Sequence, residues 1–133
     1  MRVLIVEDDF VSRKILQGFL SAFGECDIAV DGREAVEAFK MALNDGVPYD
    51  LICMDIMMPR MNGQEALLQI RQLETEAGIK EMDAVKVIMT TAVDDKKHVT
   101  EAFYKGAAAS YFVKPINREK LIGELRILGL IDP

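Results

Sequence analysis

Five short apolar runs alternate with five helical patterns along the chain. The runs are RVLIV (2–6), CDIAV (26–30), LICMD (51–55), VKVIMT (85–90) and ASYFV (109–113). The first, third and fourth are almost continuously apolar, which is typical of strands covered on both faces. Apolar residues recur at helical spacing over 10–23, 32–43, 62–76, 95–106 and 117–128. The alternation predicts a doubly wound α/β fold, a five-stranded parallel sheet with five helices on its two faces.

Length and composition indicate one domain over residues 1–133, in which half of the residues are hydrophobic. The net charge of −6 argues against direct nucleic-acid binding. No apolar run approaches the ~18 residues that span a bilayer, and the amino terminus does not resemble a signal peptide. Cys26 and Cys53 are too few for a disulfide framework or a metal knuckle. We therefore predict a cytoplasmic protein without membrane insertion.

Polar side chains follow the predicted strands at their carboxyl ends, where open α/β sheets bind ligands. They are Glu7, Asp8 and Asp9 after the first run, Asp55 in the third, Thr90 and Thr91 at the end of the fourth, and Lys114 and Pro115 after the fifth. Carboxylates crowded together repel one another and require a proton or a cation. Oxygen ligands without His or Cys favour a hard ion, Mg²⁺, with Mn²⁺ as an alternative.

The same residues suit phosphoryl transfer. Asp55 is the natural nucleophile, because a carboxylate can form an aspartyl phosphate. Lys114 and a threonine hydroxyl would then contact the transferred group. Each residue also has an ordinary explanation: Asp9 as a helix cap, Thr91 as a turn hydroxyl and Lys114 as a solvated charge. The prediction of a phosphoryl-transfer site therefore depends on the placement of all of these residues at strand ends.

Four motifs resemble those of response-regulator receiver domains, the phosphate-accepting half of bacterial two-component signalling. They are VLIVEDD, MDIMMPRMNG, MTTA and FVKP, and the resemblance covers essentially the whole chain. It implies the flavodoxin-like strand order 2-1-3-4-5, which is known from the chemotaxis regulators of this family. Because the chain stops just past the last helical pattern, we expect a stand-alone, chemotaxis-regulator-like receiver. A fragment of a larger DNA-binding or enzymatic regulator is the alternative.

The resemblance implies a phosphoacceptor and a set of metal ligands. Asp55 is the expected acceptor and also a Mg²⁺ ligand. Asp8 is expected to bind the metal directly, Met57 through its backbone carbonyl, and Glu7 through water.

The resemblance also implies a switch. Thr91, Ala92 and Lys114 are expected at the phosphoryl group, which requires Lys114 to face Asp55. Pro115 is expected to follow a cis peptide bond. Tyr111 is the expected switch aromatic, which fills the space that Thr91 vacates. The surface formed by the last two helices and the last strand would change as a result.

Two apolar residues predict slow loss of the phosphoryl group. Met57 lies two residues after Asp55, and Val93 lies two residues after Thr91. Related receivers often carry polar residues at these positions, which flank the path of the attacking water, and an apolar pair cannot orient that water. His98 is expected to be an ordinary surface residue, not a phosphorelay histidine.

Two other functions share parts of this pattern. A haloacid-dehalogenase-type phosphatase needs an Asp two residues after the nucleophile, where this chain has Met57. A phosphorylation-independent interaction module typically loses an acid, the lysine or the acceptor, and all of these are present in the sequence. We therefore expect no enzymatic activity beyond Mg²⁺-dependent self-phosphorylation and slow autodephosphorylation.

The expected partners are a sensor histidine kinase or histidine phosphotransfer protein and a downstream protein target. Partner choice is expected to depend on the helix over 10–23, through residues such as Ser12, Ile15 and Leu16. The chain itself is expected to be a monomer or a weak homodimer.

Overall fold

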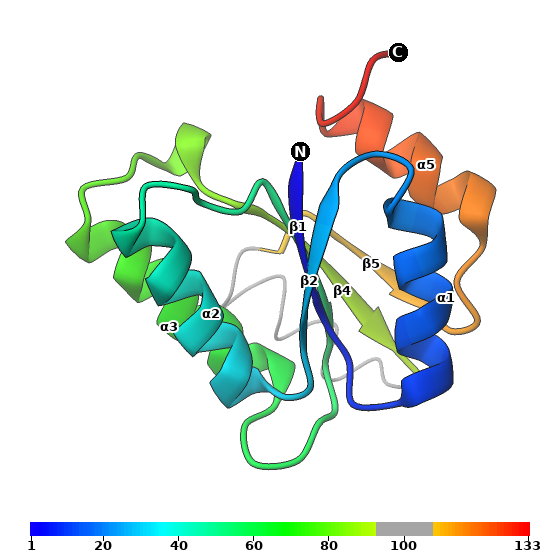
Figure 1. The fold of residues 1–133 in the computed structure, drawn as a ribbon, viewed down its shortest axis with the longest axis horizontal. Helices are drawn as coiled ribbons and strands as arrows, with labels where there is room; N and C mark the ends of the chain where they lie inside the picture. The colour runs from blue at the N-terminus through cyan, green and yellow to red at the C-terminus, as the bar shows by residue number, and fades with distance from the viewer. Residues whose placement is uncertain (93–107) are drawn as a thin grey trace.

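A parallel five-stranded sheet forms the centre of the fold (Figure 1). The computed structural model describes residues 1–92 and 108–133. The strands are β1 (Arg2–Val6), β2 (Glu25–Ala29), β3 (Leu51–Asp55), β4 (Lys86–Thr91) and β5 (Ser110–Val113). They lie in the order β2-β1-β3-β4-β5, and every neighbouring pair is parallel. The predicted sheet and its strand order are confirmed.

Helices cover both faces of this sheet. They are α1 (Phe10–Leu20), α2 (Gly32–Asn44), α3 (Gly63–Glu76) and α5 (Arg118–Ile127), with a 3₁₀ turn at Glu81–Asp83. Figure 1 shows α2 and α3 on one face and α1 and α5 on the other. The predicted helix over 95–106 lies outside the described residues, as do Val93 and His98. Within the described ranges, none of the helices has the length and apolar character needed to cross a membrane.

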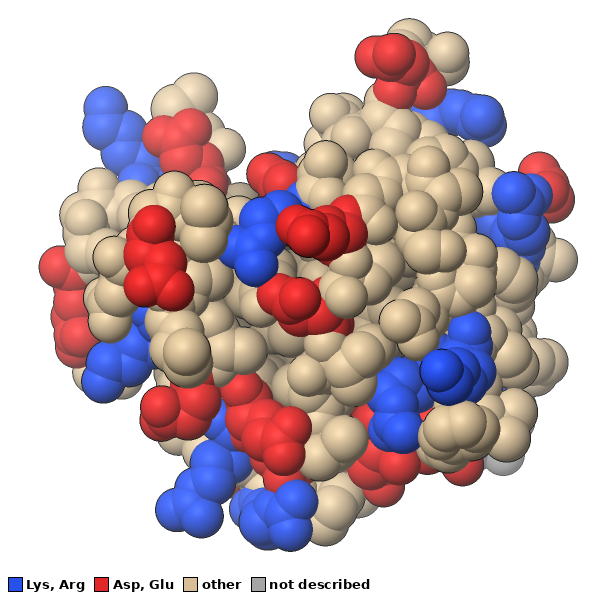
Figure 2. Space-filling model, in the orientation of Figure 1, with Lys and Arg blue, Asp and Glu red and all other residues tan. Residues whose placement is uncertain are grey.

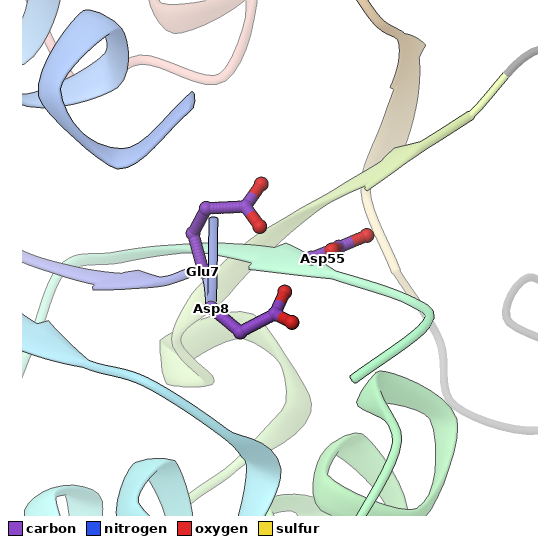
Figure 3. Close-up of side chains that lie close together, drawn as sticks. All are labelled: Glu7, Asp8 and Asp55. Atoms are coloured by element: carbon purple, nitrogen blue, oxygen red, sulfur yellow. The ribbon is translucent and has the colours of Figure 1, made fainter. Parts of the chain in front are cut away.

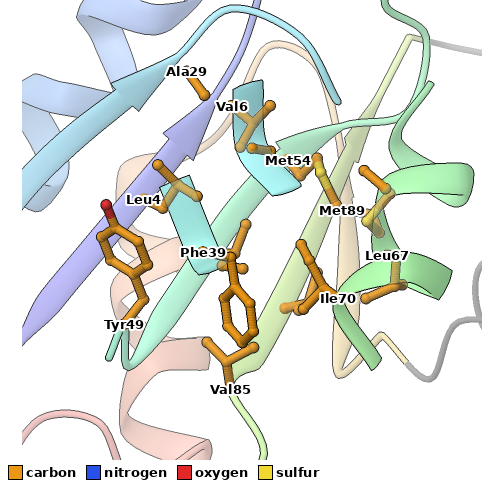
Figure 4. Close-up of a cluster of buried hydrophobic side chains, with 14 of the residues drawn as sticks. Leu4, Val6, Ala29, Phe39, Tyr49, Met54, Leu67, Ile70, Val85 and Met89 are labelled. Atoms are coloured by element: carbon orange, nitrogen blue, oxygen red, sulfur yellow. The ribbon is translucent and has the colours of Figure 1, made fainter. Parts of the chain in front are cut away.

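Side chains of the central strands alternate between two apolar cores, which explains why their sequences are continuously hydrophobic. In β1, Leu4 and Val6 belong to the core under α2 and α3, whereas Val3 and Ile5 belong to the core under α1 and α5. Figure 4 shows the first core, where the ring of Phe39 from α2 lies among strand residues. Because both faces are buried, the strand ends are left as the accessible polar edge of the sheet.

Each of these helices begins at a side chain that accepts a backbone N–H. The N-caps are Asp9, Asp31, Asn62 and Asn117. Asp and Asn are among the preferred N-cap residues, because their side-chain oxygens accept the free backbone N–H groups of the first turn. Helix α1 is shorter than the predicted 10–23: it ends at Leu20, and Phe23 lies in a following turn. Phe23 still packs against the core, so the apolar pattern continues past the end of the helix.

The start of α3 lies directly against the end of β3. The Gly63 N–H donates to the Ile56 carbonyl at 2.7 Å, and the Ile56 N–H donates to the Thr90 carbonyl at 3.0 Å. A Cβ at Gly63 would lie 2.4 Å from the carbonyl oxygen of Asp55, closer than any side chain tolerates. This glycine therefore allows the chain after Asp55 to fold back onto the sheet edge.

Candidate functional site

Three carboxylates meet at the carboxyl ends of β1 and β3 (Figure 3). Glu7 and Asp8 follow β1, and Asp55 is the last residue of β3. Since β1 and β3 are hydrogen-bonded neighbours, their ends are adjacent although Asp8 and Asp55 lie far apart in the sequence. One oxygen from each carboxylate lies within 4.8 Å of the others. The predicted convergence of these acids is confirmed.

Lys114, just after β5, reaches across to two of the acids. Its Nζ lies 2.5 Å from Oε1 of Glu7 and 3.3 Å from Oδ2 of Asp55. The expectation that Lys114 faces Asp55 is therefore confirmed. The shorter contact with Glu7 was not predicted, because the sequence placed this lysine beside Asp55 and the phosphoryl group.

Glu7 is fully buried at the centre of this arrangement. Its Oε2 accepts the backbone N–H of Asp9 at 3.1 Å, and its own N–H donates to Ala29 at 3.0 Å. Burial raises the pKa of Glu7 to about 7, and the charge of Asp55 adds to the rise, while Lys114 opposes it. Near neutral pH, Glu7 therefore carries a proton in a substantial fraction of metal-free molecules.

Asp55 is also buried, with 6% of its surface exposed. Burial raises its pKa above the ordinary range, although the Lys114 ammonium opposes this shift. Burial lowers the pKa of Lys114, but the contacts with Glu7 and Asp55 outweigh that effect and raise it overall. Lys114 thus stays charged while the acids around it compete for a proton.

Asp9 is the N-cap of α1, which is the ordinary structural role that the sequence suggested for it. Its Oδ2 accepts the Ser12 N–H at 2.8 Å, and this bond holds the pKa of Asp9 below its usual value. The cap also fixes the turn between β1 and α1. Arg13, one turn into the helix, donates to the Glu7 carbonyl at 3.0 Å.

The predicted switch residues lie along the neighbouring strand ends. Thr91 is buried, and its hydroxyl donates to the Ala92 carbonyl at 3.2 Å. The Lys114 N–H donates to the Thr91 carbonyl at 2.8 Å, which extends the β4–β5 ladder. The peptide bond between Lys114 and Pro115 is cis, as expected. Tyr111 is 43% exposed on β5.

Met57 lies in the loop that leaves the acid cluster, and its side chain is 54% exposed. A thioether at this position cannot act as an acid or base, in contrast with the carboxylate that a haloacid-dehalogenase-type phosphatase would place there. Val93, its predicted counterpart beyond the switch threonine, lies outside the described residues.

The carboxylate cluster fits a hard divalent cation. Its three members offer only oxygen ligands. If all three acids ionise, the single positive charge of Lys114 leaves two negative charges uncompensated (3 − 1 = 2). The pKa values of Glu7 and Asp55 are raised, which is consistent with this lack of compensating positive charge. A divalent cation removes it, so the donor set matches Mg²⁺ in charge and chemistry.

Asp31 and Arg60, for which the sequence predicted no role, form a further ion pair beside the site. The Arg60 Nε donates to Oδ2 of the buried Asp31 at 2.6 Å, which joins the loop after β3 to the loop before α2. A weak signal was present in the sequence: Arg60 lies in a Pro-Arg-Met-Asn-Gly turn, where left-handed backbone is common.

The raised pKa of Glu7 predicts that the metal-free protein loses stability as pH rises from about 4.5 to about 7. The folded chain holds a proton that the unfolded chain, with an ordinary value of 4.5, has released. Stability therefore falls with pH up to about 7, by roughly 3 kcal/mol at most from this group. Asp55 acts in the same direction. Urea unfolding in EDTA across this range measures the loss.

Two variants isolate the contribution of Glu7. Glu7→Gln should flatten the pH dependence, whereas Glu119→Gln, at an exposed carboxylate, should leave it unchanged. Saturating Mg²⁺ should also reduce the loss, because the cation takes the place of the proton. An identical slope in wild type and Glu7→Gln would contradict the assignment.

Comparisons with known proteins agree with this geometry. The family model "Response regulator receiver domain" matches residues 3–126. "Chemotaxis protein CheY" of Treponema pallidum is 39% identical over 123 residues, which cover 91% of this chain and 77% of that protein. Curated histidine kinases of Dictyostelium discoideum and Oryza sativa also match, but the chain spans only 7% and 12% of their lengths.

Two solved structures share the fold at appreciable sequence identity. The receiver domain of Saccharomyces cerevisiae Ssk1, in complex with the histidine phosphotransfer protein Ypd1, has a TM-score of 0.83 at 30% identity. That match covers 98% of this chain and 89% of the other. The CheX-CheY-BeF3-Mg+2 complex from Borrelia burgdorferi gives 0.78 at 30% identity, with 98% and 88% covered. This chain belongs to the response regulator receiver domain family.

Proposed function

We propose that Asp55 accepts a phosphoryl group from a sensor histidine kinase or a histidine phosphotransfer protein. The main support for this proposal is the position of the buried Asp55 carboxylate, which lies 3.3 Å from the Lys114 ammonium at an open edge of the sheet. In the transfer, an Asp55 oxygen forms a bond to phosphorus while the bond from phosphorus to the donor imidazole nitrogen breaks. The imidazole keeps the electron pair of the broken bond.

Mg²⁺ is the proposed cofactor, with Mn²⁺ as a substitute. Asp8, Asp55 and the Met57 carbonyl would bind it directly, and Glu7 would act through water. The contact of Glu7 with Lys114 supports this division, because it leaves the exposed Asp8 as the more available ligand. When bound, the cation would neutralise charge on the acids and on the incoming phosphoryl oxygens. The Borrelia burgdorferi complex, which contains BeF3 and Mg, supports the same cofactor.

The phosphodonor protein is proposed to contact α1 and the loop between β5 and α5. A cavity of about 850 Å³ lies there, next to Glu7 and Lys114. Its apolar lining includes Ile15, Leu16 and Ile116. Such a surface suits a helix that brings its histidine to the sheet edge. The Ssk1–Ypd1 complex, a receiver with a phosphotransfer protein, supports this class of partner.

The proposed output is a change of surface at β5, α5 and the segment over 95–106. The Thr91 hydroxyl and the Ala92 backbone would contact the phosphoryl group, together with Lys114. A phosphoryl group adds ~1.5–2 negative charges and three acceptor oxygens, enough to attract a hydroxyl that now bonds a carbonyl. Tyr111, 43% exposed, would then move toward the space left by Thr91.

The chain would act as a stand-alone cytoplasmic receiver, a monomer or weak homodimer, that signals to a protein target without binding nucleic acid. Basic and acidic side chains are interspersed on the face in Figure 2, unlike the basic stripe of nucleic-acid-binding surfaces. Its chemistry would be limited to self-phosphorylation and slow autodephosphorylation.

Phosphorylation with a small donor tests the acceptor directly. With acetyl phosphate and Mg²⁺, the wild type should gain one phosphoryl group per chain, measured by intact mass. Asp55→Asn should gain none, because an amide cannot form the acyl phosphate, whereas the exposed-site control Asp132→Asn should match the wild type. Equal uptake by Asp55→Asn would refute the proposal, and continuous phosphate release would indicate a phosphatase.

The apolar residue at position 57 predicts a long-lived phosphoryl group. Met57→Asn should shorten the lifetime of the phosphorylated form, because an amide can orient water where a thioether cannot. Release of phosphate from pre-phosphorylated protein, after removal of the donor, measures that lifetime. The comparison uses wild type, Met57→Asn and the isosteric control Met57→Leu, which should retain the slow rate. An unchanged lifetime in Met57→Asn would show that this residue does not limit hydrolysis.

A further inference from the structure

Backbone and side-chain contacts connect the loop after β3 to the start of α2. The Gly32 N–H donates to the Met61 carbonyl at 3.1 Å. Close by, the Nε of Arg60 donates to Oδ2 of Asp31 at 2.6 Å, and a second guanidinium nitrogen pairs with the same oxygen. The first of these loops carries Met57, which the proposed function makes a carbonyl ligand of the metal. The contact therefore lies on the segment that has to hold that carbonyl in place.

Asp31 is a fixed anchor for this contact. It is 1% exposed, and its two oxygens have different partners: Oδ1 accepts the Glu34 N–H at 2.9 Å, and Oδ2 accepts Arg60. Burial raises the pKa of Asp31, but the Glu34 N–H and the Arg60 guanidinium outweigh it and keep the pKa below the ordinary value. A charged carboxylate locked to the start of α2 thus faces the loop.

The backbone of Arg60 has a left-handed conformation, with φ at 64°. Such a conformation costs a residue with a Cβ on the order of 1 kcal/mol, and glycine adopts it without that cost. The Arg60 guanidinium offsets this cost, because two of its nitrogens pair with one oxygen of a buried carboxylate and hydrogen bonds between charged groups are stronger than neutral ones. The side chain of Arg60, rather than its backbone, therefore explains what an arginine contributes at this turn.

The two loops also touch through their backbones. A Cβ at Gly32 would lie 2.5 Å from the Met61 carbonyl oxygen and 3.0 Å from the Asn62 carbonyl oxygen. The approach places the α3 cap, Asn62, and the α2 cap, Asp31, at one junction. Both ends of the loop are therefore held: Ile56 at the sheet edge, and Arg60 and Met61 at this junction.

We propose that Arg60 and Asp31 are positioning residues of the metal site, which hold the loop so that the Met57 carbonyl points toward the carboxylate cluster. This inference rests on the proposed function, because it requires Mg²⁺ at that cluster. Neither residue touches the cation in this proposal. They act by keeping the loop in one conformation before the cation arrives, which reduces the ordering cost of binding.

The direction in which one substitution changes the Mg²⁺ affinity distinguishes a positioning role from a purely electrostatic one. Arg60→Gly removes a positive charge close to a cation site, so Coulomb's law alone predicts equal or tighter Mg²⁺ binding. Positioning predicts the opposite: binding weaker by roughly tenfold, the lower end for lost outer-shell partners. Glycine also suits the left-handed backbone at position 60, so the fold is preserved. Isothermal titration of the phosphoryl-free protein with Mg²⁺ measures the affinity without any readout of activity.

Four further variants complete the test. Arg33→Ala removes an exposed arginine two residues from Asp31 and should bind Mg²⁺ as the wild type does, or slightly more tightly. Arg60→Lys, which retains the charge but not the paired donors, should restore part of the affinity. Asp31→Asn keeps a helix-capping oxygen, and the double variant with Arg60→Gly should bind no more weakly than the weaker single variant.

The outcomes are distinct. Weaker binding in Arg60→Gly, with Arg33→Ala at or above wild-type affinity, supports the positioning role. Equal or tighter binding in Arg60→Gly, while the wild type binds Mg²⁺ and is phosphorylated, overturns this inference and leaves the proposed function intact. A wild type that binds no Mg²⁺ would overturn both.

Discussion

An excess of buried negative charge at the end of the sheet governs the chemistry of this domain. Glu7, Asp8 and Asp55 converge to within 4.8 Å, and Lys114 contacts two of them. Burial raises the pKa of Glu7 to about 7 and also raises that of Asp55, so the cluster holds a proton when no cation is present. In the proposed function, a divalent cation compensates this negative charge first, and the oxygens of the incoming phosphoryl group then need the same compensation.

The fold creates this cluster because its strands are parallel. Side chains of β1, β3 and β4 alternate between two cores, so the polar residues of these strands are found where the strands end. Gly63 lets the chain return to the sheet edge directly after Asp55, and Asp9 caps α1 directly after the two acids of β1. The acids are thus held by backbone contacts that do not depend on the acids themselves.

Much of this arrangement could be predicted from the sequence. Continuous apolar runs located the strands, and the rule that parallel strands place their carboxyl ends together brought Asp8, Asp55 and Lys114 to one edge. The family resemblance supplied the strand order. The spacing of apolar residues overestimated the length of α1. Phe23 continues the apolar pattern, but it lies in the turn after the helix, where its side chain still packs against the core.

Contacts between side chains distant in the sequence were harder to predict. The pairing of Lys114 with Glu7 at 2.5 Å and that of Arg60 with Asp31 depend on rotamers and on the exact approach of loops. No local pattern encodes either pairing. Buried charge is also invisible in the sequence, where Glu7 and Asp8 are equivalent neighbours, yet only Glu7 lies wholly inside the protein.

Proton release on Mg²⁺ binding tests the charge argument most directly. Titration calorimetry in buffers of different ionisation enthalpy gives the number of protons released per cation bound. If the cation replaces a proton shared by Glu7 and Asp55, release should approach about one proton near pH 6 and fall toward zero by pH 8.5. The same small release at both pH values would contradict the account, because the acids would then be fully ionised before the cation binds.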